Sequence, residues 1–297
     1  MISFPDIKKS EIRSHYDWAT PFYRLLWGRH IHHGLWNGDE DPREAQQRLV
    51  TTMIESANIR EGMRVLDVGC GMGGSSMELA RLAGCRVTGV TLSPVQRLWA
   101  AAESRLRGLA DRTTFLRDDA ERVEFTPASF DVVWSVECTE HLFDKPAFFR
   151  RAARWLRPDG TMIICAWLAG DDELPPKLAE QTRRVCEGFL CPSLGSPNDY
   201  RTWMQDAGLE FASFDDWTDR IVKTWEICKA RVEKSRVRLL ARIVPGMTKF
   251  LDSFETILSA YRSGAMKYGC FVFHAPTHCA DSNGSREAST LARMSSE

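Results

Sequence analysis

The sequence lacks the signatures of several large classes of protein. Its 297 residues contain no apolar run long enough to cross a bilayer, and the first residues lack the apolar segment of a signal peptide. A formal net charge of -1 offers no overall positive charge for nucleic acid. We therefore expect a cytoplasmic protein that neither inserts stably into a membrane nor binds nucleic acid.

Disulfide and metal-ligand patterns are absent as well. The nine cysteines form no Cys-x-x-Cys pair and their number is odd, which favours reduced, mostly buried thiols. Three histidines lie close together at His30, His32 and His33, but no cysteine or acid stands beside them. We therefore predict no metal site.

What is present is an alternation of strand and helix patterns. We predict strands at 64–68, 86–91, 113–116, 130–136 and 161–167, with helices at 74–83, 94–109 and 146–155. Two further strands are predicted at 209–217 and 269–275. Because strands that alternate with helices form a parallel, doubly wound sheet, we predict an α/β protein with a Rossmann-like, mostly parallel, seven-stranded sheet.

The predicted organisation has four parts. Residues 1–60 form a helical N-terminal cap segment rich in aromatics, and residues 61–168 form the cofactor-binding core. Residues 169–275 complete the core and contain a helical insertion at about 218–264, which we expect to cap the sheet. Residues 276–297 are polar and small, and we expect a disordered tail there.

The stretch that ends the first predicted strand indicates the cofactor. Asp67 is followed by glycines at 69, 71 and 74, which have the spacing of a dinucleotide fingerprint. The Asp67 carboxylate would repel a pyrophosphate but attract a cation. S-adenosylmethionine carries an ammonium and a sulfonium and no phosphate, so these residues favour it as the cofactor.

The second strand argues against a nicotinamide cofactor. A dinucleotide-binding protein needs an acid about twenty residues beyond its glycines to hold the ribose hydroxyls, and residues 89–96 contain none. Thr91 and Gln96 could hold those hydroxyls through neutral hydrogen bonds, and Asp119 with the backbone at Ala120 could bind adenine. The plainer alternatives are an ordinary helix surface and a solvated acidic loop.

Three stretches together carry a family resemblance. Residues 67–76, 89–96 and 137–145 resemble the class I S-adenosylmethionine-dependent methyltransferases, and the sequence is most similar to the gamma-tocopherol methyltransferase group, from about His15 to Ala275. The resemblance implies the following cofactor contacts: Gly69 and Gly71 at the methionine part, Thr91, Leu92 and Gln96 at the ribose, Asp119 and Ala120 at adenine, and Tyr16, His32, His33 and Gly34 over the sulfonium end.

More distant relatives differ at informative positions. Cyclopropane synthases have a bicarbonate-binding cysteine in the early segment, where this protein has His32-His33-Gly34. Sugar O-methyltransferases have a His-His pair where Glu140-His141 stands, and an acid at the position of Ala166. The resemblance therefore implies neither bicarbonate chemistry nor the complete proton-abstracting arrangement of the sugar enzymes.

Glu137 and His141 are the predicted catalytic residues. They follow the fourth strand, at the edge where parallel sheets bind ligands. A buried carboxylate stays ionised beside a sulfonium, and a neutral imidazole accepts a proton near neutral pH. The alternative is that Glu137 only orients the cofactor and that His141 caps the next helix.

Aromatic residues of the N-terminal segment and the insertion form the predicted acceptor site. Tyr23, Trp27, Trp217 and Trp225 could line an apolar pocket, although such residues are more often plain core. Residues 229–242 carry six Lys or Arg, which could contact an anionic membrane or acceptor or form a solvated helix face.

Together these patterns predict an S-adenosylmethionine-dependent methyltransferase. We expect direct methyl transfer to a carbon, nitrogen or oxygen of a small, largely apolar aromatic or prenylated metabolite, with a homodimer as a candidate assembly. The alternatives are a C-methyltransferase that acts on prenyl groups with Glu137 as base, and a non-catalytic protein that binds S-adenosylmethionine.

Overall fold

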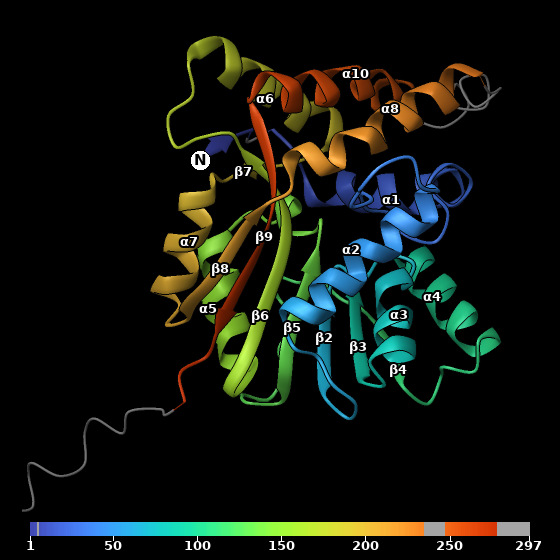
Figure 1. Ribbon diagram of the computed structural model, residues 1–297, viewed down its shortest axis with the longest axis vertical. Coiled ribbons are helices and arrows are strands. Elements are labelled where there is room, and N and C mark those ends of the chain that lie inside the picture. Colours follow the sequence, from blue (N-terminus) through green and yellow to red (C-terminus); the bar gives the residue numbers. More distant parts are fainter. Residues whose placement is uncertain (5, 235–246, 278–297) are drawn as a thin grey trace, which may run out of the picture.

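A seven-stranded sheet lies at the centre of the molecule (Figure 1). The computed structural model describes residues 1–4, 6–234 and 247–277. The strand order is β4-β3-β2-β5-β6-β9-β8. The bounds are β2 Arg64–Val68, β3 Arg86–Thr91, β4 Thr113–Arg117, β5 Phe130–Val136, β6 Leu156–Ala169, β8 Glu210–Asp216 and β9 Met266–His274. β9 pairs antiparallel with both of its neighbours, and the other adjacent strands of this sheet pair parallel, so the predicted α/β class and mostly parallel sheet are confirmed.

Both faces of the sheet are buried under helices, which explains why its strands are almost continuously apolar. Alternate side chains of β6 enter two different cores. Ile163 and Cys165 pack on the side of α2 (Pro42–Ser56) and α3 (Gly74–Leu82), whereas Met162 and Ile164 pack on the side of α5 (Lys145–Trp155) and α7 (Pro197–Asp206). This two-sided burial holds the strand ends at one common edge.

Three core helices begin with the same local device. Asp41, Ser93 and Asp144 each accept a hydrogen bond from a backbone N–H two or three residues later, and a proline follows in the first turn. Ser93 in this way starts α4 (Pro94–Leu106) directly after the end of β3. The caps of α4 and α5 therefore fix the loops that follow β3 and β5.

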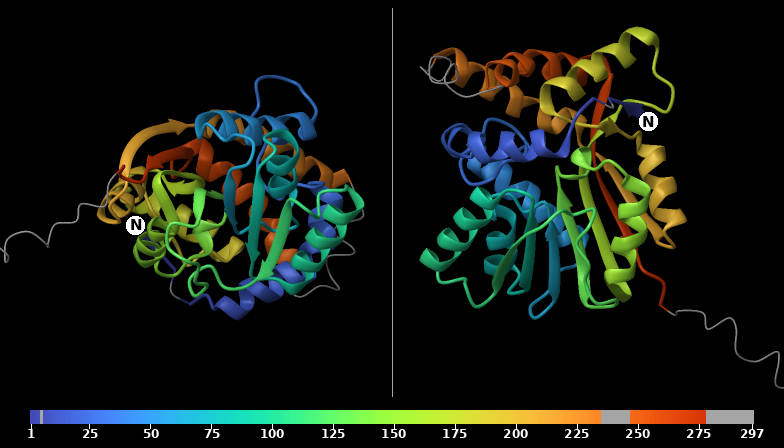
Figure 2. Two further views of the ribbon diagram at one scale, coloured as in Figure 1. Left: turned by 90° about the horizontal axis from the view of Figure 1, so that it is seen from below. Right: turned by 180° about the vertical axis from the view of Figure 1, so that it is seen from behind.

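Four helices cover the carboxyl edge of the sheet (Figures 1 and 2). They are α1 (Lys9–Leu26), α6 (Pro176–Phe189), α8 (Thr218–Lys234) and α10 (Met247–Ser263). The last two correspond to the predicted insertion, while residues 235–246 between them lie outside the described residues. The same is true of positions 236–242 of the predicted basic stretch and of the predicted tail from residue 278 onward.

The sequence did not lead us to expect α6 or the short strands β1 (Ile2–Ser3) and β7 (Ser193–Leu194), which pair antiparallel. α6 buries Val185, Cys186 and Phe189 in the cap, but charged residues surround these positions in the sequence. Among the described helices, none is both long and apolar enough to cross a membrane.

Candidate active site

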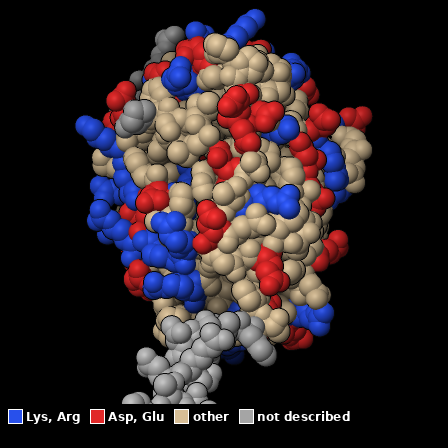
Figure 3. All heavy atoms as spheres, turned by 90° about the vertical axis from the view of Figure 1, so that its left-hand side faces the viewer, with Lys and Arg blue, Asp and Glu red and all other residues tan. Residues whose placement is uncertain are grey.

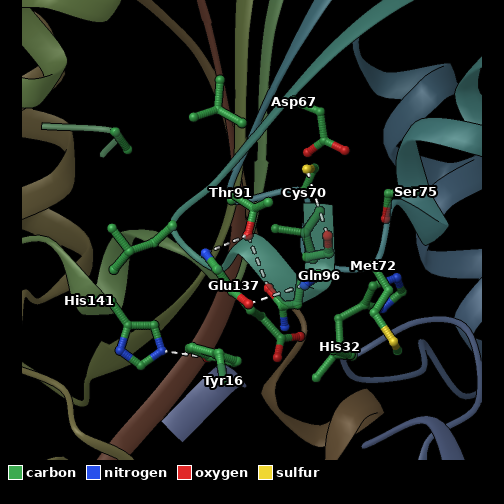
Figure 4. Close-up of a pocket in the computed structure, with 18 of the residues that line it drawn as sticks. Tyr16, His32, Asp67, Cys70, Met72, Ser75, Thr91, Gln96, Glu137 and His141 are labelled. Atoms are coloured by element: carbon green, nitrogen blue, oxygen red, sulfur yellow. Dashed lines mark hydrogen bonds between the residues drawn. The ribbon is translucent and has the colours of Figure 1, made fainter. Parts of the chain in front are cut away.

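A cavity at this edge, the cofactor cavity, is enclosed by the loops that follow β2, β3, β4 and β5 and by α1 (Figure 4). It holds about 1000 Å³ of empty space, counted with its opening to solvent. Twelve sequence-predicted residues line it: Tyr16, His32, Asp67, Gly69, Gly71, Thr91, Leu92, Gln96, Asp119, Ala120, Glu137 and His141. Strand ends far apart in the sequence thus supply one binding site.

The glycine loop leaves no room for side chains at Gly69 and Gly74, among other positions. Gly69 has a φ of +78°, and a Cβ there would lie 2.3 Å from the side chain of Cys138. A Cβ on Gly74 would lie 2.6 Å from the carbonyl oxygen of Arg29. The loop can therefore turn tightly under the cavity only because these positions lack a side chain.

Asp67 lines this cavity as a buried carboxyl. Burial raises its pKa to about 7, although the Ser76 hydroxyl, which donates a hydrogen bond to it at 2.5 Å, acts in the opposite direction. A carboxyl that is costly to ionise in the empty site gains most when a cation arrives. Asp67 is therefore suited to a ligand with a positively charged group.

The end of β3 presents neutral hydrogen-bonding groups. The Thr91 hydroxyl donates to Gln96 Oε1 at 3.0 Å, and Gln96 Nε2 is buried without a hydrogen-bond partner among the described residues. A buried amide N–H without a partner is costly unless a ligand accepts its hydrogen bond. A ribose hydroxyl satisfies that need, so Asp67, Gln96 and the glycine loop fit S-adenosylmethionine.

Asp119 is not the solvated acid that one alternative supposed. Its carboxylate accepts hydrogen bonds from Lys9 Nζ at 2.7 and 3.0 Å, and Glu121 accepts from the same ammonium at 2.5 Å. This ion pair ties the start of α1 to the loop after β4. Lys9 was not among the predicted site residues, because nothing in its own segment marks it.

A second cavity adjoins the first and has aromatic walls, and we call it the acceptor cavity because Tyr23, Trp27 and Trp225 of the predicted acceptor site line it. It holds about 510 Å³ of empty space with its opening. Its lining residues are Tyr16, Tyr23, Trp27, Ile31, His33, Glu137, Glu140, His141, Trp167, Phe189, Cys191, Trp225 and Phe250. Four of these, Tyr16, Ile31, Glu137 and His141, also line the cofactor cavity. The two cavities therefore meet at those four side chains.

Three predicted site residues lie elsewhere than expected. His33 lines the acceptor cavity but not the cofactor cavity. Gly34 lines neither of these two, and its N–H donates to Thr224 Oγ1 at 3.0 Å. Trp217 also lines neither, and its N–H donates to the carbonyl of Tyr268 at 2.8 Å. Gly34 and Trp217 thus support the walls without lining either cavity.

Glu137 lies at the junction in a strained backbone conformation with a φ of +50°. Its carboxylate accepts four hydrogen bonds: from His33 N and His33 Nδ1 at 2.8 Å, from the Tyr268 hydroxyl at 2.9 Å and from Trp167 Nε1 at 3.1 Å. Burial alone would raise its pKa, but the charge and hydrogen bonds of His33 and the charge of His32 lower it overall. Glu137 is therefore held ionised.

Glu140, also in the acceptor cavity, has the opposite character. Burial raises its pKa to about 8, although the backbone N–H of Trp167 donates a hydrogen bond to Oε1. Its Oε2 is buried without a partner in the described part of the chain. At neutral pH this group is mostly a neutral acid that can donate a hydrogen bond. Neighbouring carboxyls with pKa values shifted in opposite directions are typical of functional sites.

His141 joins α1 to the core. Its Nδ1–H donates to the carbonyl of Leu190 at 3.0 Å, so Nε2 accepts a hydrogen bond from the Tyr16 hydroxyl at 2.8 Å. Burial lowers the His141 pKa to about 4, which keeps the ring neutral. It does not cap the next helix, because Asp144 does so.

Comparison with known proteins shows the family of this protein. The family model described as mycolic acid cyclopropane synthetase matches residues 5–264. The probable chloroplastic tocopherol O-methyltransferase of Oryza sativa subsp. japonica is 33% identical over 284 residues, which cover 90% of this chain and 78% of that protein. The 27-O-demethylrifamycin SV methyltransferase of Amycolatopsis mediterranei is 31% identical over 86% of this chain and 91% of its own length.

Solved structures share the fold at lower identity. The [4+2]-cyclase SpnF superposes with a TM-score of 0.79 at 23% identity, covering 93% of this chain and 99% of that protein. The cyclopropane synthase MmaA2 of Mycobacterium tuberculosis also gives 0.79, at 16% identity and with coverage of 91% and 100%. These likenesses concern the fold, which different chemistries can share.

Fold, site and relatives together define a class I methyltransferase that depends on S-adenosylmethionine. Within that class, the protein belongs to the mycolic acid cyclopropane synthetase family, and it belongs to the tocopherol methyltransferase-like group.

Proposed function

We propose that this enzyme methylates a small, neutral or weakly basic, largely apolar aromatic or prenylated metabolite held in the acceptor cavity. The observation that carries the proposal is the junction of the two cavities at Tyr16, Ile31, Glu137 and His141. A sulfonium methyl at the end of one cavity would face an acceptor in the other, in the alignment that direct transfer needs.

The lining of the acceptor cavity supports this choice of acceptor. Its described residues include no Lys or Arg, and most carry an aromatic or imidazole ring: Tyr16, Tyr23, Trp27, His33, His141, Trp167, Phe189, Trp225 and Phe250. Such walls favour flat apolar molecules. With the ionised carboxylate of Glu137 and no Lys or Arg among its described lining residues, the cavity disfavours a diphosphate. Relatives named tocopherol O-methyltransferases support a phenolic acceptor.

His33 is our candidate for the proton acceptor. In its neutral form the ring would donate Nδ1–H to Glu137 and keep a lone pair on Nε2, and Nε2 is buried without a partner among the described residues. An imidazole oriented by a carboxylate is a general base of the usual kind. S-adenosylmethionine supplies the methyl group as an activated electrophile. His33 would take the proton of an acceptor hydroxyl as the oxygen–carbon bond forms, the sulfur–methyl bond breaks and S-adenosylhomocysteine leaves.

Glu137 would supply a fixed negative charge and would orient the His33 ring. Four donors and a lowered pKa make its carboxylate a poor proton acceptor, which disfavours the prenyl C-methyltransferase alternative with Glu137 as base. Its negative charge would stabilise the sulfonium and the protonated His33. His141 would hold Tyr16 in place across both cavities, as a positioning residue.

The test combines binding and turnover. Calorimetry measures the affinity for S-adenosylmethionine and S-adenosylhomocysteine. Transfer of a labelled methyl group is then followed with γ-tocopherol, simple phenols, secondary amines and geranyl diphosphate as acceptors. Methylation of a phenol or amine supports the proposal. Methylation of the diphosphate alone would favour the prenyl alternative, and binding without transfer to any of them would favour a non-catalytic protein.

We also propose a cytoplasmic location and a homodimer as the candidate assembly. The names of the two plant relatives place those proteins in the chloroplast. Cell fractionation tests the location, and the mass of the purified protein in solution tests the dimer.

A further inference from the structure

Exposed apolar side chains gather on α1 and α4. Trp18 and Leu25 of α1 are 64% and 68% exposed, and Leu98 and Leu106 of α4 are 61% and 88% exposed. Trp99 adds a further ring at 36%. We call these five residues the α1–α4 patch. Single exposed leucines are ordinary, but two tryptophans and three leucines on two adjacent helices are not.

The two helices lie side by side in both views of Figure 2. The Ser93 hydroxyl at the start of α4 donates to Asp17 of α1 at 2.5 Å. Further along, Arg24 of α1 lines one shallow depression together with Trp99 and Leu106 of α4. The outward faces of the helices therefore form one continuous surface.

A wide depression lined by arginines adjoins this patch. The arginines are Arg24, Arg29, Arg43, Arg81, Arg107 and Arg231, and the acids that line it with them are Asp41 and Glu78. Leu25 of the patch is also part of its wall. Burial and the positive charge of Arg107 lower the pKa of Arg29, Glu103, which pairs with both arginines, raises it, and the charges of Arg43 and Arg24 lower it further. We call this the arginine depression.

We propose that the α1–α4 patch and the arginine depression dock the enzyme on an anionic phospholipid bilayer. Tryptophan and leucine favour the boundary between headgroups and acyl chains, and guanidinium groups bind phosphate oxygens in pairs. The side of the molecule away from these helices carries charges of both signs, with Lys and Arg gathered along one edge (Figure 3). The α1–α4 face combines exposed apolar side chains with clustered cations.

This surface lies next to both cavities, so membrane docking would serve the reaction. This step rests on the proposed apolar acceptor. Trp27 lines both the arginine depression and the acceptor cavity. Arg29 and His30 line both the depression and the cofactor cavity. Docking would bring an apolar acceptor dissolved in the bilayer close to residues that also line the acceptor cavity and the cofactor cavity.

Co-sedimentation with vesicles tests the surface without any acceptor. The full-length protein is mixed with vesicles of phosphatidylcholine, with and without phosphatidylglycerol, at low and high salt. We expect binding to the anionic vesicles that salt weakens. Trp18→Ser with Leu106→Ser should abolish it, and Arg43→Gln or Arg81→Gln should each weaken it roughly fivefold.

The matched control changes a basic residue outside this face. Arg183→Gln on α6 should leave vesicle binding unchanged. S-adenosylmethionine binding by calorimetry should be equal in all variants. Absence of vesicle binding with intact cofactor binding would overturn the docking proposal alone. Loss of a dimer in the Trp18 and Leu106 variant without any vesicle binding would overturn it in favour of a second copy of the protein.

Discussion

The cofactor cavity and the acceptor cavity lie side by side but are built in different ways. In the cofactor cavity, Asp67, Thr91 and Asp119 each lie at or just beyond the end of one strand of the parallel sheet. In the acceptor cavity, Trp27 and Trp225 come from segments far apart in the sequence and meet with ring centroids 5.9 Å apart. One site is made by loops on a rigid sheet, the other by packing between cap helices.

This difference has an electrostatic side. Asp67 lines the cofactor cavity, and its raised pKa suits it to a cationic ligand. The acceptor cavity holds Glu137, whose pKa is lowered, beside Glu140, whose pKa is raised. Binding in the cofactor cavity should therefore depend on the charge of the ligand. Chemistry in the acceptor cavity should depend on the protonation states of Glu137 and Glu140.

The largest expected effect separates chemistry in the acceptor cavity from binding in the cofactor cavity. His33→Gln should lower kcat by roughly 10²- to 10⁴-fold, because a general base contributes about that much. Its affinity for S-adenosylmethionine should stay unchanged, because His33 does not line the cofactor cavity. Methyl transfer and calorimetry on the same preparation measure the two. Wild-type kcat in this variant would remove His33 as the base.

A second change tests whether the cofactor cavity depends on its backbone. Gly69→Ala should destabilise the protein by about 3 kcal/mol, since it combines a positive φ with a close contact to Cys138. Gly62→Ala is the matched control, because Gly62 has a φ of +82° with open space around it, and should cost only about 1 kcal/mol. Urea denaturation compares them. Equal losses would show that the contact with Cys138 is unimportant.

A third change tests the charge in the cofactor cavity. Asp67→Asn should weaken S-adenosylmethionine binding roughly 10- to 100-fold, as expected for a lost hydrogen bond to a charged group. Because the Asp67 pKa is about 7 in the free protein and a cation lowers it, wild-type affinity should fall as the pH drops below 7. Calorimetry across pH checks both effects. Asp131→Asn, on β5 and outside the cavity, should bind normally.

The smallest effect concerns Glu140 and stability. Its pKa in the folded protein, about 8, lies above the ordinary value of 4.5. The contribution of Glu140 to the free energy of unfolding is therefore fully present below pH 4.5 and is lost as the pH rises towards 8. Glu140→Gln should remove this decline and gain about 1 to 2 kcal/mol at about pH 9 relative to wild type. Thermal unfolding at several pH values measures it, and parallel curves would contradict the assignment.

The sequence alone predicted the core of the fold and twelve of the residues that line the cofactor cavity. Alternating strands and helices set the sheet, and the side chains at its carboxyl edge stand next to strands in the sequence, where spacing reveals them. Asp67, Thr91 and Asp119 could be predicted because each depends on a local turn and not on distant packing.

Only the tertiary structure decided the acceptor cavity. In the structure, Trp167 and Phe189 also line the acceptor cavity. His33 lines this cavity instead of the cofactor cavity, and Trp217 lines neither. An aromatic residue in a helix looks the same in the sequence whether it faces a core or a cavity. Which of the two it faces depends on how α1, α6, α8 and α10 pack together, and that packing energy arises between segments far apart in the sequence.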